Sequence, residues 1–338
     1  MPVEVEAAAA GEAEEAGSAL RERFAPEATR IDGWFDASGA ILPAPARRYL
    51  VHDFLPEGET GLLVARGGTG KGFLELYLAT SIALGESFGR FDVERPRGVV
   101  VVSREDDREE LHRRFAATLR ARFPGGPTLE QVRRLKEGLR FVDLRGVRGG
   151  RLGPDLVEHI GSTTRALADC GLVILDPLGK LLPEEVVSLN SQEGAAAVHQ
   201  ELDVLGWETG CAVLLAHHVN KTAVREGASA GASTGSQLLE DLARFVVALN
   251  EVKGDDAKGY GLDPEHRLGF VALTVTKANY APPLRDPFLL ERVEGGALLP
   301  REVRSPRDLQ AEAVLRVLVE AFEATGEGLS QSAWEKGC

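Results

Sequence analysis

The sequence of 338 residues contains no apolar run near the roughly 18 residues that a membrane-spanning helix needs. Its first residues are acidic and do not form a basic segment followed by an apolar core, so we expect no signal peptide. These absences predict a cytoplasmic protein with no membrane partner.

Cysteine is scarce, and basic residues are fewer than acidic ones. The three cysteines, Cys170, Cys211 and Cys338, lie far apart without metal-ligand spacing, which fits a reducing compartment and predicts no disulfide framework. The 39 basic residues against 52 acidic ones give a formal net charge of −13. This balance excludes a protein that coats nucleic acid with a broad basic surface, but it leaves open a ring with a narrow basic channel.

Short apolar segments alternate with helical patterns through most of the chain. The expected strands are 61–64, 98–103, 139–143, 172–176 and 211–216, and the expected helices are 73–84, 108–122, 154–169 and 191–209. Further strands at 242–252, 270–277 and 288–293 have hairpin-like connections. This order predicts an α/β fold with a mostly parallel central sheet, helices on both faces and antiparallel strands toward the C-terminal end.

A glycine-rich loop with a lysine joins the first expected strand to the first expected helix. It is formed by Gly67, Gly68, Thr69, Gly70, Lys71 and Gly72, and Phe73 follows it. In a P-loop the glycines let backbone N–H groups turn toward phosphate oxygens, and the lysine reaches the β- and γ-phosphates. The spacing therefore predicts an ATP site, with an ordinary glycine-rich turn as the alternative.

Two positions depart from the full P-loop pattern. Ala65 stands where the first glycine is usual, and Gly72 stands where a serine or threonine hydroxyl usually binds Mg²⁺. Water can replace one Mg²⁺ ligand, since this ion usually keeps several waters. The sequence thus supports nucleotide binding more directly than efficient hydrolysis.

Polar side chains follow three of the expected strands. Asp176 ends an apolar strand about a hundred residues after the P-loop, where it would hold Mg²⁺ through water or begin a turn before Pro177. Glu105 follows strand 98–103, where it would polarise the attacking water or act as a helix N-terminal acid. His217 and His218 follow strand 211–216, and γ-phosphate sensing, a structural role and metal binding all remain open. Because neighbours on a strand face opposite sides, we expect one histidine buried and the other in the site.

Five segments together resemble the RepA-type replicative helicases of the hexameric RecA-like ATPase superfamily. They are GGTGKG, VVVVSREDD, LVILDPLGKL, VLLAHHVNK and LLEDLARFVV, and the resemblance covers residues 45–280. It implies a homo-oligomeric ring, a hexamer, with ATP and Mg²⁺ at each interface and single-stranded DNA and other replication proteins as partners.

The resemblance also implies roles for four residues. Glu105 would be the catalytic base, Asp176 the Mg²⁺-linked acid, His218 the γ-phosphate sensor and Arg244 an arginine finger supplied by a neighbouring subunit. Without the resemblance, Arg244 is an ordinary surface or interface arginine.

The chain also departs from the family pattern. Thr234-Gly235-Ser236-Gln237 stands where the family often has Arg-Gly-Ser-Ser, and the expected DNA-contacting loops offer as basic residues Lys180, Lys221 and Arg225. Three functions therefore stay open: a ring helicase or translocase, a regulatory or assembly ATPase without unwinding, and a nucleotide-binding scaffold without turnover.

Three regions are expected along the chain. Residues 1–30 form an acidic flexible tail, 31–300 the RecA-like ATPase domain, and 301–338 a helical segment that starts a truncated winged-helix-like module. Within the middle region, we expect 44–51 to form a short strand or cover the nucleotide base. We also expect 253–264 to be a surface loop, and 219–236 a functional or disordered loop.

Overall fold

A computed structural model describes residues 46–148, 150–167, 169–183, 186, 191–218, 237–263, 265–281, 287–301, 311, 314–320 and 322. The tail at 1–30, the loop at 219–236 and most of 301–338 lie outside these residues. Among the described residues, no helix is both long and apolar enough to cross a bilayer.

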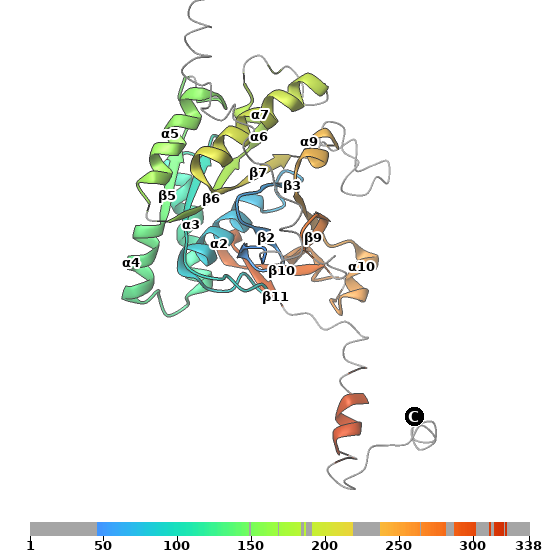
Figure 1. The fold of residues 1–338 in the computed structure, drawn as a ribbon. Coiled ribbons are helices and arrows are strands. Elements are labelled where there is room, and N and C mark those ends of the chain that lie inside the picture. The colour runs from blue at the N-terminus through green and yellow to red at the C-terminus, as the bar shows by residue number, and fades with distance from the viewer. Residues whose placement is uncertain are drawn as a thin grey trace, which may run out of the picture. The chain divides into compact units, whose positions relative to one another are not determined.

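A sheet of nine strands in the order β11-β10-β9-β8-β3-β7-β6-β4-β5 organises the fold (Figure 1). Six of its strands are mutually parallel: β3 (Thr60–Ala65), β4 (Gly98–Ser103), β5 (Leu139–Asp143), β6 (Cys170–Asp176), β7 (Ala212–His218) and β8 (Phe245–Glu251). The remaining three, β9 (Phe270–Ala278), β10 (Phe288–Arg292) and β11 (Leu298–Arg301), continue the sheet in antiparallel order. The predicted fold class is therefore confirmed.

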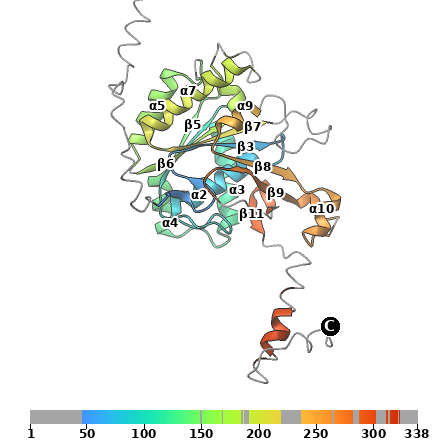
Figure 2. The same ribbon diagram turned by 45° about the vertical axis from the view of Figure 1, so that its right-hand side comes forward.

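The central parallel strands, such as β4 and β6, are buried on both faces, with successive side chains on opposite sides of the sheet. On β3, Leu63 packs in one core and Leu62 in the other. Helices α2 (Lys71–Leu84), α3 (Arg108–Arg122) and α4 (Leu129–Gly138) accompany the first core. Helices α5 (Pro154–Arg165), α6 (Leu178–Leu181), α7 (Gln192–Thr209) and α9 (Gln237–Leu242) accompany the second (Figure 2).

Most predicted elements are present, with shifted ends. The strand expected to begin at 242 begins at Phe245, because residues up to Leu242 form α9, and the helix expected to reach 169 ends at Arg165. The residues at 44–51 include a buried strand, β1 (Tyr49–Val51), which pairs with β2 (Leu55–Pro56). The strand alternative for that segment is confirmed.

The segment 253–264 is not only a surface loop, and that expectation was wrong. It contains α10 (Gly254–Gly259), which begins after Lys253. The helix forms because Ala257 is fully buried against Val252, Ala272 and Leu289 on the antiparallel side of the sheet. Two single-turn 3₁₀ helices, η3 (Arg267–Gly269) and η4 (Glu294–Gly296), complete this part of the chain.

A candidate nucleotide site at the carboxyl ends of the strands

The glycine-rich loop connects β3 to α2 and is open where phosphate would bind. Gly67 and Gly68 are exposed, and a Cβ added to either would meet no atom within 4 Å. Gly68 and Gly70 have φ values of 84° and 105°, which glycine adopts without the strain of other residues. Gly70 caps α2 without a side-chain hydrogen bond, so no side chain competes for the N–H groups of the first turn.

Lys71 and Asp176 meet directly at this edge of the sheet. Lys71 begins α2, Asp176 ends β6, and Lys71 Nζ donates to Asp176 Oδ1 at 2.8 Å with both side chains buried. Burial alone would lower the pKa of Lys71, but the charges of Glu75 and Asp176 outweigh it and the pKa is raised. Lys71 is therefore a cation beside the open loop.

Glu105 and His218 are brought together from the ends of β4 and β7. His218 Nε2 lies 3.3 Å from Glu105 Oε2, and Lys180 Nζ lies 3.8 Å from the same oxygen. Burial would raise the pKa of Glu105, but the contact with His218 and the charge of Lys180 outweigh it and the pKa is lowered. Glu105 is a half-exposed carboxylate that solvent can reach.

The two adjacent histidines face opposite sides of β7, as strand geometry predicts. His218 is 41% exposed beside Glu105, whereas His217 is largely enclosed. Burial, with smaller contributions from the charges of His218 and Lys71, lowers the pKa of His217 to about 4. Within the described part of the chain, no cluster of three metal-ligating side chains is present.

Two acids and an arginine near the P-loop add to the site residues that the sequence predicted. Glu75 of α2 is fully buried, its Oε1 has no hydrogen-bond partner in the described structure, and burial and the charge of Asp176 raise its pKa. Asp106 is also buried and forms an ion pair with Arg114 of α3, Oδ2 to Nη1, at 2.7 Å. The local signals were an acid inside an apolar helix face and Glu110 placed four residues before Arg114.

These acids allow a test of whether the site suits Mg²⁺. Carboxylate oxygens are the donors that this ion prefers, and it is commonly held by one or two carboxylates together with phosphates and waters. Asp176 supplies one such carboxylate, and its charge contributes to raising the pKa of both Glu75 and Asp106. Gly72 supplies no ligand, so the residues fit Mg²⁺ held mainly by the nucleotide and water.

Arg292 also reaches the P-loop, although it lies far from the loop in the sequence. Its Nη2 donates to the carbonyl oxygen of Thr69 at 2.8 Å, and its guanidinium lies beside Gly70. Because 223 residues separate Arg292 from Thr69, no local pattern signals this contact. β10 ends at Arg292 and therefore fixes the loop from the antiparallel side of the sheet.

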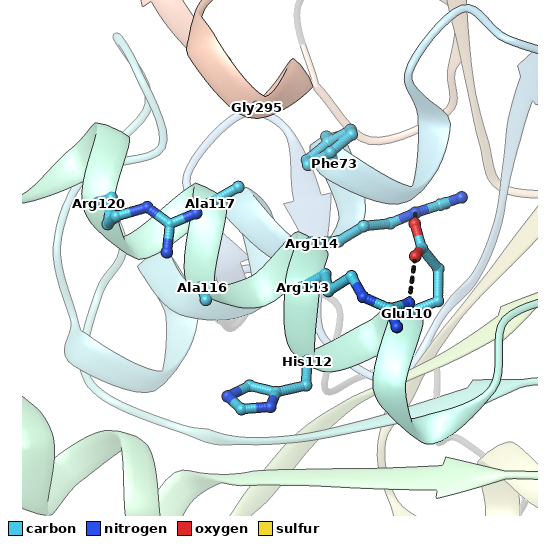
Figure 3. Close-up of a pocket in the computed structure, with 9 residues that line it drawn as sticks. All are labelled: Phe73, Glu110, His112, Arg113, Arg114, Ala116, Ala117, Arg120 and Gly295. Carbon is cyan, nitrogen blue, oxygen red and sulfur yellow. Dashed lines mark hydrogen bonds and ion pairs between the residues drawn. The ribbon is translucent and has the colours of Figure 1, made fainter.

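A pocket of 610 Å³ adjoins the end of the P-loop (Figure 3). Phe73 and Gly295 border it from α2 and η4, and the remaining lining comes from α3. That lining contains one acid, Glu110, together with basic and small apolar side chains. These are His112, Arg113, Arg114, Ala116, Ala117 and Arg120. The size and mixed lining suit a small organic group attached to phosphates.

Arg244 does not join this cluster. Its N–H donates to the carbonyl oxygen of Thr60 at 2.9 Å, and its Nε lies 3.9 Å from Glu59 Oε2. Thr60 begins β3 and the P-loop follows the end of that strand, about 16 Å away at 3.3 Å per residue. Arg244 therefore lies near the amino ends of the parallel strands, whereas the nucleotide site of its own chain lies at their carboxyl ends.

The sheet order and the P-loop at the end of β3 define a P-loop ATPase domain of the RecA-like class. Residues 25–224, more than half of the chain, match a family model described as an AAA domain. The chain belongs to this AAA domain family.

Two solved structures show similarity over most of the chain. One of them, the structure of an ATPase domain, has a TM-score of 0.52 at 16% identity, over 73% of this chain and 86% of that one, which shows the shared fold. A KaiC-like protein from the hyperthermophilic archaeon Pyrococcus horikoshii has a TM-score of 0.49 at 17% identity, over 76% of this chain and all of that one.

Proposed function

We propose that this chain is an ATP-hydrolysing motor of the RepA-type helicase kind, acting as a ring on single-stranded DNA. The observation that carries the ATPase part is the arrangement of two pairs at one sheet edge. Lys71 and Asp176 lie 2.8 Å apart beside the open P-loop, and Glu105 and His218 lie 3.3 Å apart next to them. Ligands of open α/β sheets bind at this edge.

In this proposal, different residues bind the phosphates, the nucleoside and the Mg²⁺ ion. The exposed backbone of Gly67 and Gly68, the first turn of α2 and Lys71 hold the phosphates. The pocket beside Phe73 takes the nucleoside, because an aromatic ring and small side chains suit a planar base. Asp176 would hold Mg²⁺ through water, and the ion would neutralise charge on the phosphates.

Glu105 is the proposed general base. Its carboxylate is ionised, because its pKa is lowered, and it is exposed enough to accept a proton from a water molecule. His218 contacts Glu105 at the end of β7, and in this proposal it responds to the γ-phosphate. Loss of that phosphate would then reach the segment that follows β7, where Lys221 and Arg225 stand in the sequence.

The position of Lys180 supports DNA binding, and the position of Arg244 supports ring assembly. Lys180 follows β6 and is 52% exposed at the same edge as Glu105. Six copies around a channel would multiply this charge despite the net charge of −13. Arg244, which lies near the opposite edge of its own sheet, would complete the site of a neighbouring subunit.

An ATPase assay with and without single-stranded DNA tests the proposal. Phosphate release should rise several-fold with DNA, and the rise should shrink between low and high salt, because contacts to DNA phosphates are salt-sensitive. A forked DNA labelled with a fluorophore then reports unwinding. Hydrolysis that ignores DNA would favour a regulatory or assembly ATPase, and tight ATP binding without turnover would favour a nucleotide-binding scaffold.

A further inference from the structure

The space above Gly72 is occupied by an arginine side chain. A Cβ added to Gly72 would lie 3.0 Å from Arg114 Nη1, closer than side chains normally approach. Residue 72 is the position where most P-loops carry the hydroxyl that binds Mg²⁺. At this position the chain therefore has no hydroxyl, and a side chain there would require Arg114 Nη1 to move by a few tenths of an ångström.

Arg114 is held in this position by three groups. Its Nη1 pairs with Asp106 Oδ2 at 2.7 Å, its Nε donates to Glu110 Oε1 at 3.0 Å, and its Cζ lies 5.8 Å from the centre of the Phe73 ring. The side chain is 31% exposed and lines the pocket that adjoins the P-loop (Figure 3). A ligand in the pocket can therefore reach the guanidinium.

The charge balance of this region favours a further cation at the phosphates. Asp176, Glu105 and Asp106 lie at the same edge, Lys71 is already paired with Asp176, and Arg292 donates to the carbonyl oxygen of Thr69 in the loop. An incoming triphosphate meets these carboxylates as well as Lys71. A guanidinium binds phosphate oxygens through two parallel N–H groups and keeps its charge at any relevant pH.

We propose that Arg114 binds the phosphates of the nucleotide in cis, in the place of the usual P-loop hydroxyl, and that Gly72 is the residue that admits it. The proposal rests on the nucleotide site described under Proposed function. It makes the absence of a hydroxyl at residue 72 an exchange of a Mg²⁺ ligand for a guanidinium that binds the phosphates directly. It follows that nucleotide affinity depends less on Mg²⁺ than in a P-loop that carries the hydroxyl.

The test is ATP and ADP binding measured by calorimetry, once with Mg²⁺ and once with excess EDTA. We expect the unmodified protein to lose less than about 10-fold in ATP affinity when Mg²⁺ is removed. Arg114→Ala should lose about 10- to 100-fold in EDTA, the size expected for hydrogen bonds to a charged group, and less with Mg²⁺ present. Arg114→Lys should fall between the two, because it keeps the charge but not the fork.

An exchange variant makes the test sharper. Gly72→Ser combined with Arg114→Ala restores the usual P-loop hydroxyl and removes the guanidinium. It should recover affinity with Mg²⁺ and remain weak in EDTA. Gly72→Ser alone should weaken binding, because its side chain and Arg114 compete for the same space.

Arg133→Ala is the matched control. Arg133 lies on α4, pairs with Glu130 and Glu137, and has no contact with the pocket, so this variant loses similar helix ion pairs without touching the site. Thermal melting of every variant identifies any that fail to fold, and Arg114→Lys retains the charge where Arg114→Ala does not fold.

Two outcomes would overturn the proposal. One is Arg114→Ala or Arg114→Lys that binds ATP as tightly as the unmodified protein in EDTA. The other is an unmodified protein whose binding disappears in EDTA. If Lys71→Ala abolishes binding while both arginine variants behave normally, the nucleotide site stands and only the role of Arg114 fails. If the unmodified protein binds no nucleotide under any condition, the proposed function itself fails.

Discussion

The environment of His217 opposes its charged form. It is mostly buried at the end of β7, its Nδ1 has no hydrogen-bond partner in the described structure, and its pKa is lowered to about 4. An unfolded histidine has a pKa near 6.5. Between these two values the unfolded chain binds a proton that the folded chain does not, so the free energy of unfolding falls as the pH falls.

This difference predicts acid sensitivity that depends on one side chain. Between pH 7.5 and pH 5, the unmodified protein should lose about 2 kcal/mol more unfolding free energy than His217→Asn, which cannot take up the proton. Urea unfolding at the two pH values measures it. His159→Asn, which changes an exposed histidine on α5, should behave like the unmodified protein, and an equal pH dependence in His217→Asn would contradict the assignment.

Four of the residues that the sequence predicted for the site share one property. Lys71, Asp176, Glu105 and His218 lie at or after the carboxyl end of a parallel strand, and these ends meet at one edge of a sheet. Arg114 and Arg292 follow no such rule, because their positions depend on how α3 and β10 pack against the P-loop. Contacts of that kind arise from tertiary packing and leave no periodic pattern in the sequence.

At the scale of elements, strongly apolar strands were easier to predict than short helices. The strands at Gly98–Ser103 and Leu139–Asp143 have the predicted ends, because the first is a continuous β-branched run and the second alternates. Helix α4 was missed although Thr128 and Gln131 form a capping box, a signal that the sequence contained. Helix α10 depends on the burial of one small residue, Ala257, which only the folded chain shows.

The end of β10 is expected to tune the P-loop through Arg292. Arg292→Ala removes the hydrogen bond to the Thr69 carbonyl, so the loop should be less well ordered before ATP binds. We expect the KM for ATP to rise about 3- to 10-fold, the size expected for one hydrogen bond, with kcat changed less than about 2-fold. Steady-state kinetics measure both.

Arg301→Ala is the control for this variant. Arg301 lies on the adjacent strand β11, is 60% exposed and has a carboxylate of Glu291 3.8 Å away. Its removal should leave the KM unchanged. An unchanged KM in Arg292→Ala would mean that the contact with Thr69 does not help to order the loop.

At the scale of the whole molecule, the role proposed for Arg244 would make assembly part of the chemistry. Arg244 lies beside the start of β3, and the P-loop begins after the end of the same strand. The proposed arginine finger can therefore act only on the nucleotide of another subunit. Arginine fingers contribute about 10³- to 10⁵-fold to the rate of phosphoryl transfer.

We predict that the rate of ATP hydrolysis per subunit falls when the protein is diluted below the concentration at which it assembles. Arg244→Ala should bind ATP normally and hydrolyse it at least about 10³-fold more slowly. Mixing it with Glu105→Gln should restore part of the activity, because some interfaces then combine an intact Glu105 with an intact Arg244. Full activity in a monomer, or no recovery in mixed assemblies shown to form, would count against a shared site.

The central claim is that ATP is hydrolysed at this site with Glu105 as the base. The most direct measurement compares ATP binding and phosphate release in the same preparation of the unmodified protein and Glu105→Gln, with Glu109→Gln as the matched exposed acid on α3. The account predicts binding within about 3-fold of the unmodified protein and hydrolysis lower by at least about 100-fold in Glu105→Gln alone. Normal hydrolysis in Glu105→Gln together with an inactive Asp106→Asn would contradict it and move the base to the neighbouring residue.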